Sequence, residues 1–434
     1  RIKALKPTDA PPTFHLPGGP GGSYLPMLQR NPASFLRYRA CGDVVVIDQR
    51  GFSQRGEVLK FHANTPDDPL DQPANLEREC ADFVKLSQAA VADCTKKGID
   101  LRGYTVKECV EDLNDLRQAL GYKQVTLVGV SFGSQWSFAT MKLHPEIVAR
   151  AVLSGVEPLD MGFDMPTGVY GAIQRIWKEA EKDKALQPYL PAGGLEAAAQ
   201  AVAKRLDAAP VKVTVKEKDG EAVVTLGKTD FQQAMQVPVQ ESPAFMLSLY
   251  YEHYDGWAKS VLKSRRSHGM DLRIIGPCID TSLGVTPGRL KRLKADPMVA
   301  MLGEWNWASY IAAADTWPSA DVGDEFRTPV ETPIPVVFAE GDWDTKTPFE
   351  NTVELAKSFP KSRVIIDEHG GHGVLDPICV RCPKEWNQIL DFIQTGTFPE
   401  LPERVSLPTP KFTVPDFPPP TAAKDPAEPA NVIK

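Results

Sequence analysis

The chain has 434 residues, of which 42% are hydrophobic and 24% are charged, and its formal net charge is −7. These values are ordinary for a globular protein, and the length suggests two or three domain-sized units. The negative charge argues against nucleic acid or an anionic membrane surface as a partner. No apolar run approaches the roughly 20 residues that a membrane span needs.

The chain opens with Arg1-Ile2-Lys3, without an initiator methionine or a signal peptide, so we expect a processed or trimmed form. Its seven cysteines are too sparse for a disulfide scaffold, and the C-x-x-C pair of Cys379 and Cys382 has no second pair to complete a zinc site. We expect an exported protein, secreted or periplasmic, with some structural disulfides and at least one free thiol; a cytoplasmic protein is the alternative. Nothing in the sequence calls for a metal or a cofactor.

The first elements are predicted to be strands separated by a glycine-rich loop. Residues 1–6 alternate like a half-buried strand, and Thr13 to Leu16 form the next one. The loop at residues 17–22, Pro-Gly-Gly-Pro-Gly-Gly, is too rich in glycine for a helix or sheet. Its backbone N–H groups can converge on an anion, although a flexible connector is the alternative. Asp43 to Asp48 is the following buried strand, closed by Gln49-Arg50-Gly51.

Two amphipathic helices are predicted next, at residues 75–94 and from Val110 to Leu120, where Gly121 serves as the C-cap. The β-branched and aliphatic run from Val125 to Val130 then predicts a buried parallel strand. A further strand is expected from Ala149 to Leu153.

The turn after the Val125 strand contains Ser131. The residues Gly129-Val130-Ser131-Phe132-Gly133 fit G-x-S-x-G, and a helix is predicted from Ser134 to Leu143. Between a strand and a helix, this motif forms a sharp turn from which the serine hydroxyl projects away from the backbone. The glycines are needed because the backbones approach too closely for a Cβ. The alternative is a glycine-flanked turn with a solvated serine.

Residues 157–329 are interpreted as an inserted cap, because their pattern is largely helical. Two alternating runs, 211–215 and 222–226, flank Lys218-Asp219-Gly220, and Asp-Gly in this setting is a strong hairpin signal. The cap divides a core whose first part is residues 1–156.

The second part of the core is residues 330–398. Its predicted strands run from Pro335 to Ala339 and from Ser362 to Ile366, and its helices run from Phe349 to Ser358 and from Pro383 to Gln394. Residues 399–434 are dense in proline and predict an extended tail, laid over the surface or disordered.

Alternating strands and helices predict a mostly parallel sheet with helices on both faces. Ligands of such sheets bind at the carboxyl ends of the strands, where Ser131, Asp344 and His372 are expected. A neutral imidazole would take the serine proton, and the carboxylate would orient the imidazole. The amide of Phe132 and an amide of the Gly18-Gly19 loop would stabilise the oxyanion.

Other residues compete for these roles. Asp342 is the alternative to Asp344, and His369 is expected to be a surface or supporting residue beside His372. Asp48 and Arg50 are predicted to form an ion pair that fixes a loop, rather than to act in catalysis.

Several motifs together resemble one group of proteins. Pro17-Gly18-Gly19-Pro20-Gly21 is similar to the H-G-G-P-G oxyanion loop of the proline iminopeptidases, and its P-G-G-P-G form to that of the bacterial tripeptidyl aminopeptidases. Asp48-Gln49-Arg50-Gly51 resembles the D-Q-R-G of this group. Gly341 to Pro348 resembles its aspartate turn, and Gly371-His372-Gly373 resembles its histidine turn.

The resemblance covers roughly residues 12–156 and 330–396, and it implies an α/β-hydrolase fold with the second oxyanion donor at Gly19. One departure is Pro17, which takes the place of the motif's histidine, whereas His15 lies two positions earlier.

A second departure lies in the late cap. The group often shows C-x-x-W-P there, but this chain has Ala314-Asp315-Thr316-Trp317-Pro318, which leaves Cys278 without an evident partner. The group's sheet also opens with an antiparallel hairpin. Residues 1–6 resemble its second strand, so we expect the first strand to be missing from these residues.

The combined prediction is a serine hydrolase of the α/β-hydrolase fold with an inserted, mainly helical cap that contains a β-hairpin. The expected activity is release of N-terminal residues from peptides, with an esterase, lactonase or amidase acting on small molecules as the first rival. A catalytically silent binding protein is the second rival. An aminopeptidase must hold a substrate ammonium, and the cap carboxylates Glu241, Asp280 and Glu304 are candidates, although each is equally compatible with simple solvation.

Overall fold

The computed structural model describes residues 1–420, except residues 54, 55, 66, 219, 267, 268, 305, 330, 399 and 407. A seven-stranded sheet lies at its centre, in the order β11-β10-β9-β5-β4-β1-β2, and the neighbouring strands are parallel. This confirms the predicted α/β-hydrolase fold. The strands are β1 Thr13–Leu16, β2 Val44–Val46, β4 Val125–Ser131, β5 Val148–Val156, β9 Val336–Gly341, β10 Ser362–Glu368 and β11 Arg404–Ser406.

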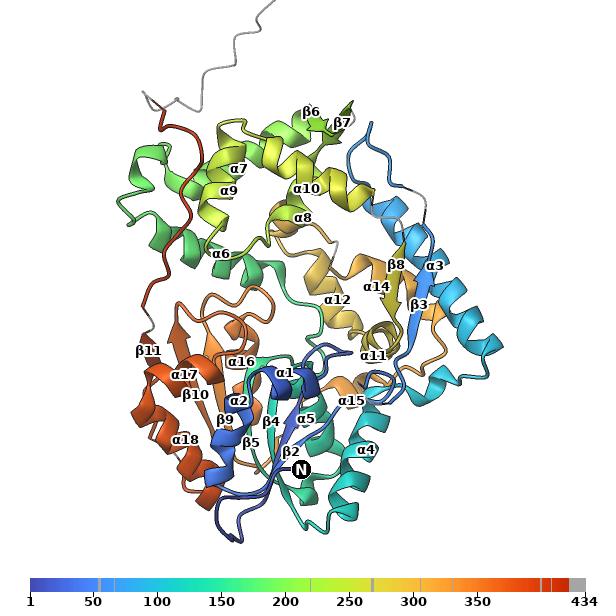
Figure 1. Ribbon diagram of the computed structural model, residues 1–434, viewed down its shortest axis with the longest axis vertical. Coiled ribbons are helices and arrows are strands. Elements are labelled where there is room, and N and C mark those ends of the chain that lie inside the picture. Colours follow the sequence, from blue (N-terminus) through green and yellow to red (C-terminus); the bar gives the residue numbers. More distant parts are fainter. Residues whose placement is uncertain are drawn as a thin grey trace, which may run out of the picture.

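Helices cover both faces of this sheet (Figure 1). Successive side chains of a strand point to opposite faces of the sheet. Leu127 accordingly packs in the apolar cluster under α4 and α5, whereas Val128 packs in the cluster under α17 and α18. Each face is therefore a separate hydrophobic layer. The helices of the core are α1 Leu25–Arg30, α2 Ala33–Leu36, α4 Val106–Ala119, α5 Phe132–Leu143, α16 Phe349–Leu355, α17 Leu375–Arg381 and α18 Pro383–Thr395.

The chain between β5 and β9, which we call the insertion, is mainly helical and lies beyond one end of the sheet (Figure 1). The predicted hairpin is confirmed, because β6 (Val211–Glu217) pairs antiparallel with β7 (Gly220–Leu226); Asp219 lies outside the described residues. The helices are α6 Pro166–Ala180, α7 Gly194–Ala208, α8 Lys228–Ala234, α9 Ser242–Tyr250, α10 Asp255–Arg265, α11 Ile275–Leu283, α12 Pro287–Lys294, α13 Val299–Leu302, α14 Ala308–Ala313 and α15 Asp324–Arg327.

A segment from the first half of the chain joins the insertion in space. Strand β3 (Lys60–Ala63) pairs antiparallel with β8 (Met270–Arg273), and α3 (Leu76–Lys96) packs against α14. Cys94 and Cys278 are both buried in the apolar cluster between these elements. Residues that precede the Ser131 strand thus help to build the insertion.

The start of the chain differs from the prediction. Residues 1–6 form no continuous strand, since only Ile2 bridges to Val44, with the Ile2 N–H donating to the Val44 carbonyl at 2.7 Å. In the tail, which was predicted to be extended, Arg404–Ser406 forms an edge strand of the main sheet that the sequence analysis did not predict. Residues 421–434 lie outside the described residues.

All seven cysteines are free thiols, so the expectation of structural disulfides is not met, and Cys278 is one of the buried ones. Burial raises the pKa of several of these thiols above the ordinary value, and it raises that of Cys278 to about 12. Within the described part of the chain, no helix is both long and apolar enough to cross a membrane.

Candidate active site

Ser131 stands at the junction of β4 and α5 in a conformation that few residues adopt. Its φ is +58° and its ψ is −129°. A Cβ on Gly129 would lie 2.4 Å from the Gly133 carbonyl oxygen, and a Cβ on Gly133 would lie 2.2 Å from the carbonyl oxygen of Leu16. Both positions therefore require glycine, and the G-x-S-x-G segment forms the predicted strand-to-helix turn with a strained serine at its tip.

Asp344 and His372 are joined at the same edge of the sheet. Nδ1 of His372 lies 2.8 Å from Oδ2 of Asp344, and the Thr347 hydroxyl donates to that oxygen at 2.7 Å. The other oxygen accepts the backbone N–H groups of Lys346 at 2.7 Å and Thr347 at 3.0 Å. The Asp344 side chain is fully buried, whereas that of His372 is 32% exposed. A buried, four-times hydrogen-bonded carboxylate fixes the imidazole and leaves its other nitrogen free to react.

The rival residues have different partners. Asp342 accepts the backbone N–H of His369 at 2.9 Å and pairs with Arg404 at 3.2 Å. His369 packs its ring on Trp343 and points Nε2 toward Glu179 at 3.9 Å. The geometry therefore places Asp344 rather than Asp342 beside the histidine of the site.

Gly155, at the end of β5, lies beneath the His372 ring. Its φ is +55°, and a Cβ there would lie 2.8 Å from Cε1 of the imidazole. The next residue, Val156, pairs with Ser131 across the β4–β5 register. The histidine is thus seated one strand away from the serine. The sequence analysis missed Gly155, which lies inside β5 after Leu153 and Ser154, beyond the end of the strand predicted there.

The glycine-rich loop lies against the serine on the other side. A Cβ on Gly18 would lie 3.1 Å from Cβ of Ser131. Gln49 holds the loop by accepting the Gly21 N–H at 2.6 Å, and Asp48 accepts the Ser23 hydroxyl at 2.8 Å. Figure 1 shows this N-terminal segment at the end of the sheet that faces the insertion.

Two backbone amides remain the predicted oxyanion donors. Phe132 is the first residue of α5, so its N–H belongs to the turn whose amides have no partner within the helix. Gly19 has a φ of +131° in the loop beside Ser131. Its N–H stays a predicted donor.

The D-Q-R-G segment supports this loop, but not through the predicted ion pair. Arg50 donates to both oxygens of Asp112, at 2.7 and 2.6 Å, and to the Gly103 carbonyl at 2.6 Å. Asp48 instead serves the glycine-rich loop through Ser23. The two residues therefore fix different elements, and the predicted Asp48–Arg50 pair is wrong.

His15 takes no part in the site. It is 3% exposed on β1, its ring lies 4.6 Å from that of Tyr38, and burial lowers its pKa to about 3. A neutral, packed imidazole of this kind is a core residue.

Of the three predicted cap carboxylates, Asp280 is the one on a helix that contacts the glycine-rich loop. It lines a cavity of about 460 Å³ whose walls include Phe163, Tyr310 and Trp317. No described side chain donates a hydrogen bond to it, and burial raises its pKa to about 7. Its helix α11 adjoins the glycine-rich loop, since a Cβ on Gly21 would lie 3.0 Å from Cγ2 of Ile275.

Glu241 and Glu304 line two other cavities, and neither wall contains a residue of the site described above. The Glu241 cavity also contains Trp257 and Arg265, and the Glu304 cavity contains Lys228. The substrate-binding role of these two residues stays a prediction.

Two further acidic residues lie near Asp344. Burial raises the pKa of Glu157 well above its usual value, and the carboxylates of Asp164, Asp280 and Asp344 add to this effect. Asp164 is 7% exposed and accepts the Asn351 amide at 2.5 Å, and burial raises its pKa to about 7. The sequence analysis missed both, although Glu157 directly follows a buried strand.

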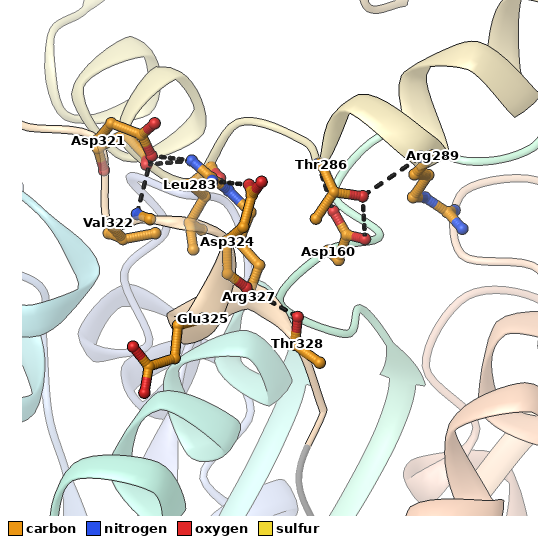
Figure 2. A network of polar contacts seen from close by, with 12 residues as sticks. Asp160, Leu283, Thr286, Arg289, Asp321, Val322, Asp324, Glu325, Arg327 and Thr328 are labelled. Atoms are coloured by element: carbon orange, nitrogen blue, oxygen red, sulfur yellow. Dashed lines mark hydrogen bonds and ion pairs between the residues drawn. The ribbon is translucent and has the colours of Figure 1, made fainter.

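The one cation at the rim of the Asp280 cavity is already neutralised within the described residues. Arg327 is 3% exposed and donates to Asp321, to Asp324 at 2.7 Å and to the Leu283 carbonyl (Figure 2). The Arg327 guanidinium is therefore already paired with Asp321 and Asp324, so it does not neutralise the Asp280 carboxylate.

A second contact in the same view joins the start of the insertion to α12. Asp160, just after β5, accepts the backbone N–H of Thr286 at 2.7 Å and its hydroxyl at 2.9 Å (Figure 2). Thr286 is the N-cap of α12. This contact and the Arg327 cluster, which joins α15 to the end of α11, link segments of the insertion around the Asp280 cavity to one another.

Comparison with known proteins places the chain among hydrolases. Residues 14–376 match the family model described as alpha/beta hydrolase fold. The tripeptidyl aminopeptidase of Streptomyces lividans is 24% identical over 400 residues, which cover 82% of this chain and 70% of that protein, and that of Streptomyces coelicolor matches equally. Among solved structures, MGS-M2, an alpha/beta hydrolase enzyme from a Medee basin deep-sea metagenome library, aligns over 91% of this chain and 92% of that chain with 12% identity and a TM-score of 0.38.

Proposed function

This chain belongs to the alpha/beta hydrolase fold family, and on that premise we propose that it is a serine hydrolase that releases N-terminal residues from peptides through an acyl-enzyme on Ser131. The proposal is supported by the strained turn at Ser131 and by the hydrogen-bonded pair of Asp344 and His372. The 24% identity with tripeptidyl aminopeptidases supports the peptidase class.

In the proposed mechanism, the Ser131 hydroxyl attacks the scissile carbonyl while Nε2 of His372 takes its proton. Asp344 stabilises the resulting imidazolium through Nδ1. The N–H groups of Phe132 and Gly19 receive the oxyanion of the tetrahedral intermediate. His372 then protonates the leaving amine, and a water molecule, activated by the same imidazole, releases the acyl group from Ser131.

The single observation that favours an aminopeptidase is the half-buried Asp280 carboxylate, which faces a cavity without a cationic partner among the described side chains. A substrate ammonium would supply the missing charge. The nearby carboxyls of Asp164, Asp280 and Asp344 together raise the pKa of Glu157, so an ammonium that bound in this acidic region would also relieve the repulsion between them. A buried carboxylate gains most from a ligand that pairs with it directly.

We further propose that the insertion acts as a cap that closes over Ser131 and selects the substrate. Asp280 and the aromatic walls of its cavity, Phe163, Tyr310 and Trp317, belong to the insertion rather than to the sheet. Changes to these walls would then alter substrate preference more than they alter the reactivity of Ser131.

The deciding experiment compares aminoacyl and tripeptidyl chromogenic substrates, each with a free and an acetylated N-terminus, with simple p-nitrophenyl esters. We expect acetylation to lower kcat/KM by roughly tenfold to a hundredfold or more, because a buried carboxylate is left unpaired. Equal cleavage of free and acetylated substrates would favour the esterase instead. No labelling of Ser131 by a fluorophosphonate would contradict the hydrolase itself.

A further inference from the structure

The C-terminal segment crosses from the sheet to the insertion. We call residues 404–406 and 408–417 the strap. It begins in β11, which pairs with β10 at the edge of the sheet, and it then runs up to the helices of the insertion (red in Figure 1). A proline-rich segment without partners would stay mobile, so the contacts along the strap must be what fixes its path.

The first part of the strap contacts Asp342 and Trp343, the two residues that precede Asp344 in the chain. Arg404 donates to Oδ2 of Asp342 at 3.2 Å. Phe412 is 3% exposed, and its ring centroid lies 6.1 Å from that of Trp343. Two successive residues of the acid turn therefore pack against the strap.

The upper part of the strap is fixed to the insertion. The Thr413 N–H donates to the Gln240 carbonyl at 2.8 Å. The Phe417 ring stacks on His253 with centroids 3.9 Å apart, and its carbonyl accepts the Tyr189 hydroxyl at 2.9 Å. Such aromatic pairs stabilise the contact beyond the area that they bury.

Trp343 connects these contacts to the reactive residues. Its side chain is 2% exposed and packs within the apolar cluster of the insertion, next to Phe412. Its backbone N–H donates to the Gly370 carbonyl at 2.9 Å, in the loop that carries His372. The ring of Trp343 thus packs in the insertion, while its backbone joins the turn that carries Asp344 to the turn that carries His372.

We infer that Trp343 is a positioning residue, through which the strap and the insertion together hold the Asp344–His372 pair in its reactive geometry. The inference deepens the proposed function and rests on it. Phe412 packs directly on Trp343, whereas the ring contacts of Phe417 within the described residues are with Tyr189, Tyr251 and His253 of the insertion. Loss of Phe412 should therefore disturb the pair, and loss of Phe417 should not.

The test compares Phe412→Ala and Phe417→Ala in the full chain, with Val414→Ala, at an exposed strap residue, as the control. The first readout is the rate at which a small fluorophosphonate labels Ser131 across pH, because this probe needs little of the substrate cavity. We expect Phe412→Ala to slow labelling by about tenfold and to lower kcat for p-nitrophenyl acetate with KM unchanged, since small misplacements of reacting groups are costly. Phe417→Ala and Val414→Ala should stay within about twofold of the unchanged protein.

The second readout is the downfield NMR signal of the proton between His372 and Asp344, assigned by its loss in His372→Gln. It should broaden or shift in Phe412→Ala and persist in Phe417→Ala, whatever the nucleophile is. Phe412→Leu keeps an apolar side chain at this position and should restore most of the rate if Phe412→Ala folds poorly. An unchanged signal and rate in Phe412→Ala, or equal losses in both strap variants, would overturn the inference. A wild-type protein that shows the signal but leaves Ser131 unlabelled would instead contradict the proposed function.

Discussion

Gly155 and His372 are in van der Waals contact, with so little space between them that a single methyl group on the glycine would reach 2.8 Å from Cε1 of the imidazole. The glycine is the penultimate residue of β5, and the last residue of that strand, Val156, pairs with Ser131. The His372 ring can therefore take its orientation only because residue 155, on the neighbouring strand, is a glycine and has no Cβ.

Gly155→Ala should displace the imidazole and lower kcat by roughly tenfold to a hundredfold. The matched control is Gly98→Ala, at a glycine whose φ is +73° but whose added Cβ would meet no atom within 4 Å. Both variants introduce backbone strain of about 1–2 kcal/mol, and only the first introduces a clash. Similar steady-state rates in the two variants would show that the contact is unimportant.

Ser131→Ala should abolish turnover while leaving the fold intact, because the hydroxyl is the proposed nucleophile. We expect kcat to fall by far more than about a hundredfold, as is typical when a triad member is lost. Ser260→Ala, at an exposed serine of α10, is the control and should leave kcat unchanged. A Ser131→Ala protein that keeps more than about a hundredth of the wild-type rate would need another nucleophile.

Asp280→Asn should reduce kcat/KM for substrates with a free N-terminus by about tenfold to a hundredfold, because a hydrogen bond to a charged group is lost. Acetylated substrates and simple esters should be affected little. Glu241→Gln, in a separate cavity of the insertion, is the matched control. Equal effects of the two variants on the free-amine substrate would rule out Asp280 as the ammonium partner.

The same residue predicts a pH dependence. Because the pKa of Asp280 is raised to about 7, its carboxyl is neutral at lower pH and cannot attract an ammonium. The ratio of kcat/KM between the wild type and Asp280→Asn should therefore be large at pH 8 and fall toward one below pH 7. This ratio cancels the titration of His372, which both proteins share. A ratio that does not change with pH would contradict the assignment.

A fifth prediction concerns stability rather than activity. Asp367 on β10 is fully buried, neither carboxylate oxygen has a hydrogen-bond partner among the described residues, and burial raises its pKa to about 7. The unfolded chain releases this proton near pH 3.9, so the folded state binds more protons between these values and loses stability as the pH rises toward 7. Asp367→Asn should therefore raise Tm at pH 8 and change it little near pH 4. Asp9→Asn, at an exposed residue, should change it at neither pH.

The sequence predicted those parts of the site that depend on local geometry. Ser131 and its two glycines could be recognised because the steric requirement lies within five residues. Asp344 and His372 could be recognised because each follows a strand, and all strands of a parallel sheet end at one edge.

The parts that were missed depend on neighbours far apart in the chain. Gly155 and Glu157 matter because β5 lies between β4 and β9, and strand order is not written in any one segment. Arg50 was paired with the nearby Asp48, but its partner Asp112 comes from α4, 62 residues away. The edge strand Arg404–Ser406 has only three residues and follows a proline-rich stretch. It is therefore too short to show the alternation of apolar and polar residues from which its pairing with β10 could have been predicted.

The two ends of the described chain also decide what the main sheet presents to other molecules. Ile2 bridges to Val44 in β2, and Arg404–Ser406 adds a last strand beside β10, so a terminal segment pairs with β2 near one border of the sheet and with β10 near the other. An uncovered border would offer a row of unpaired N–H and C=O groups to the same row on a second molecule. Proteolytic trimming at either end would thus expose a template for aggregation in a protein whose hydrophobic layers are still intact.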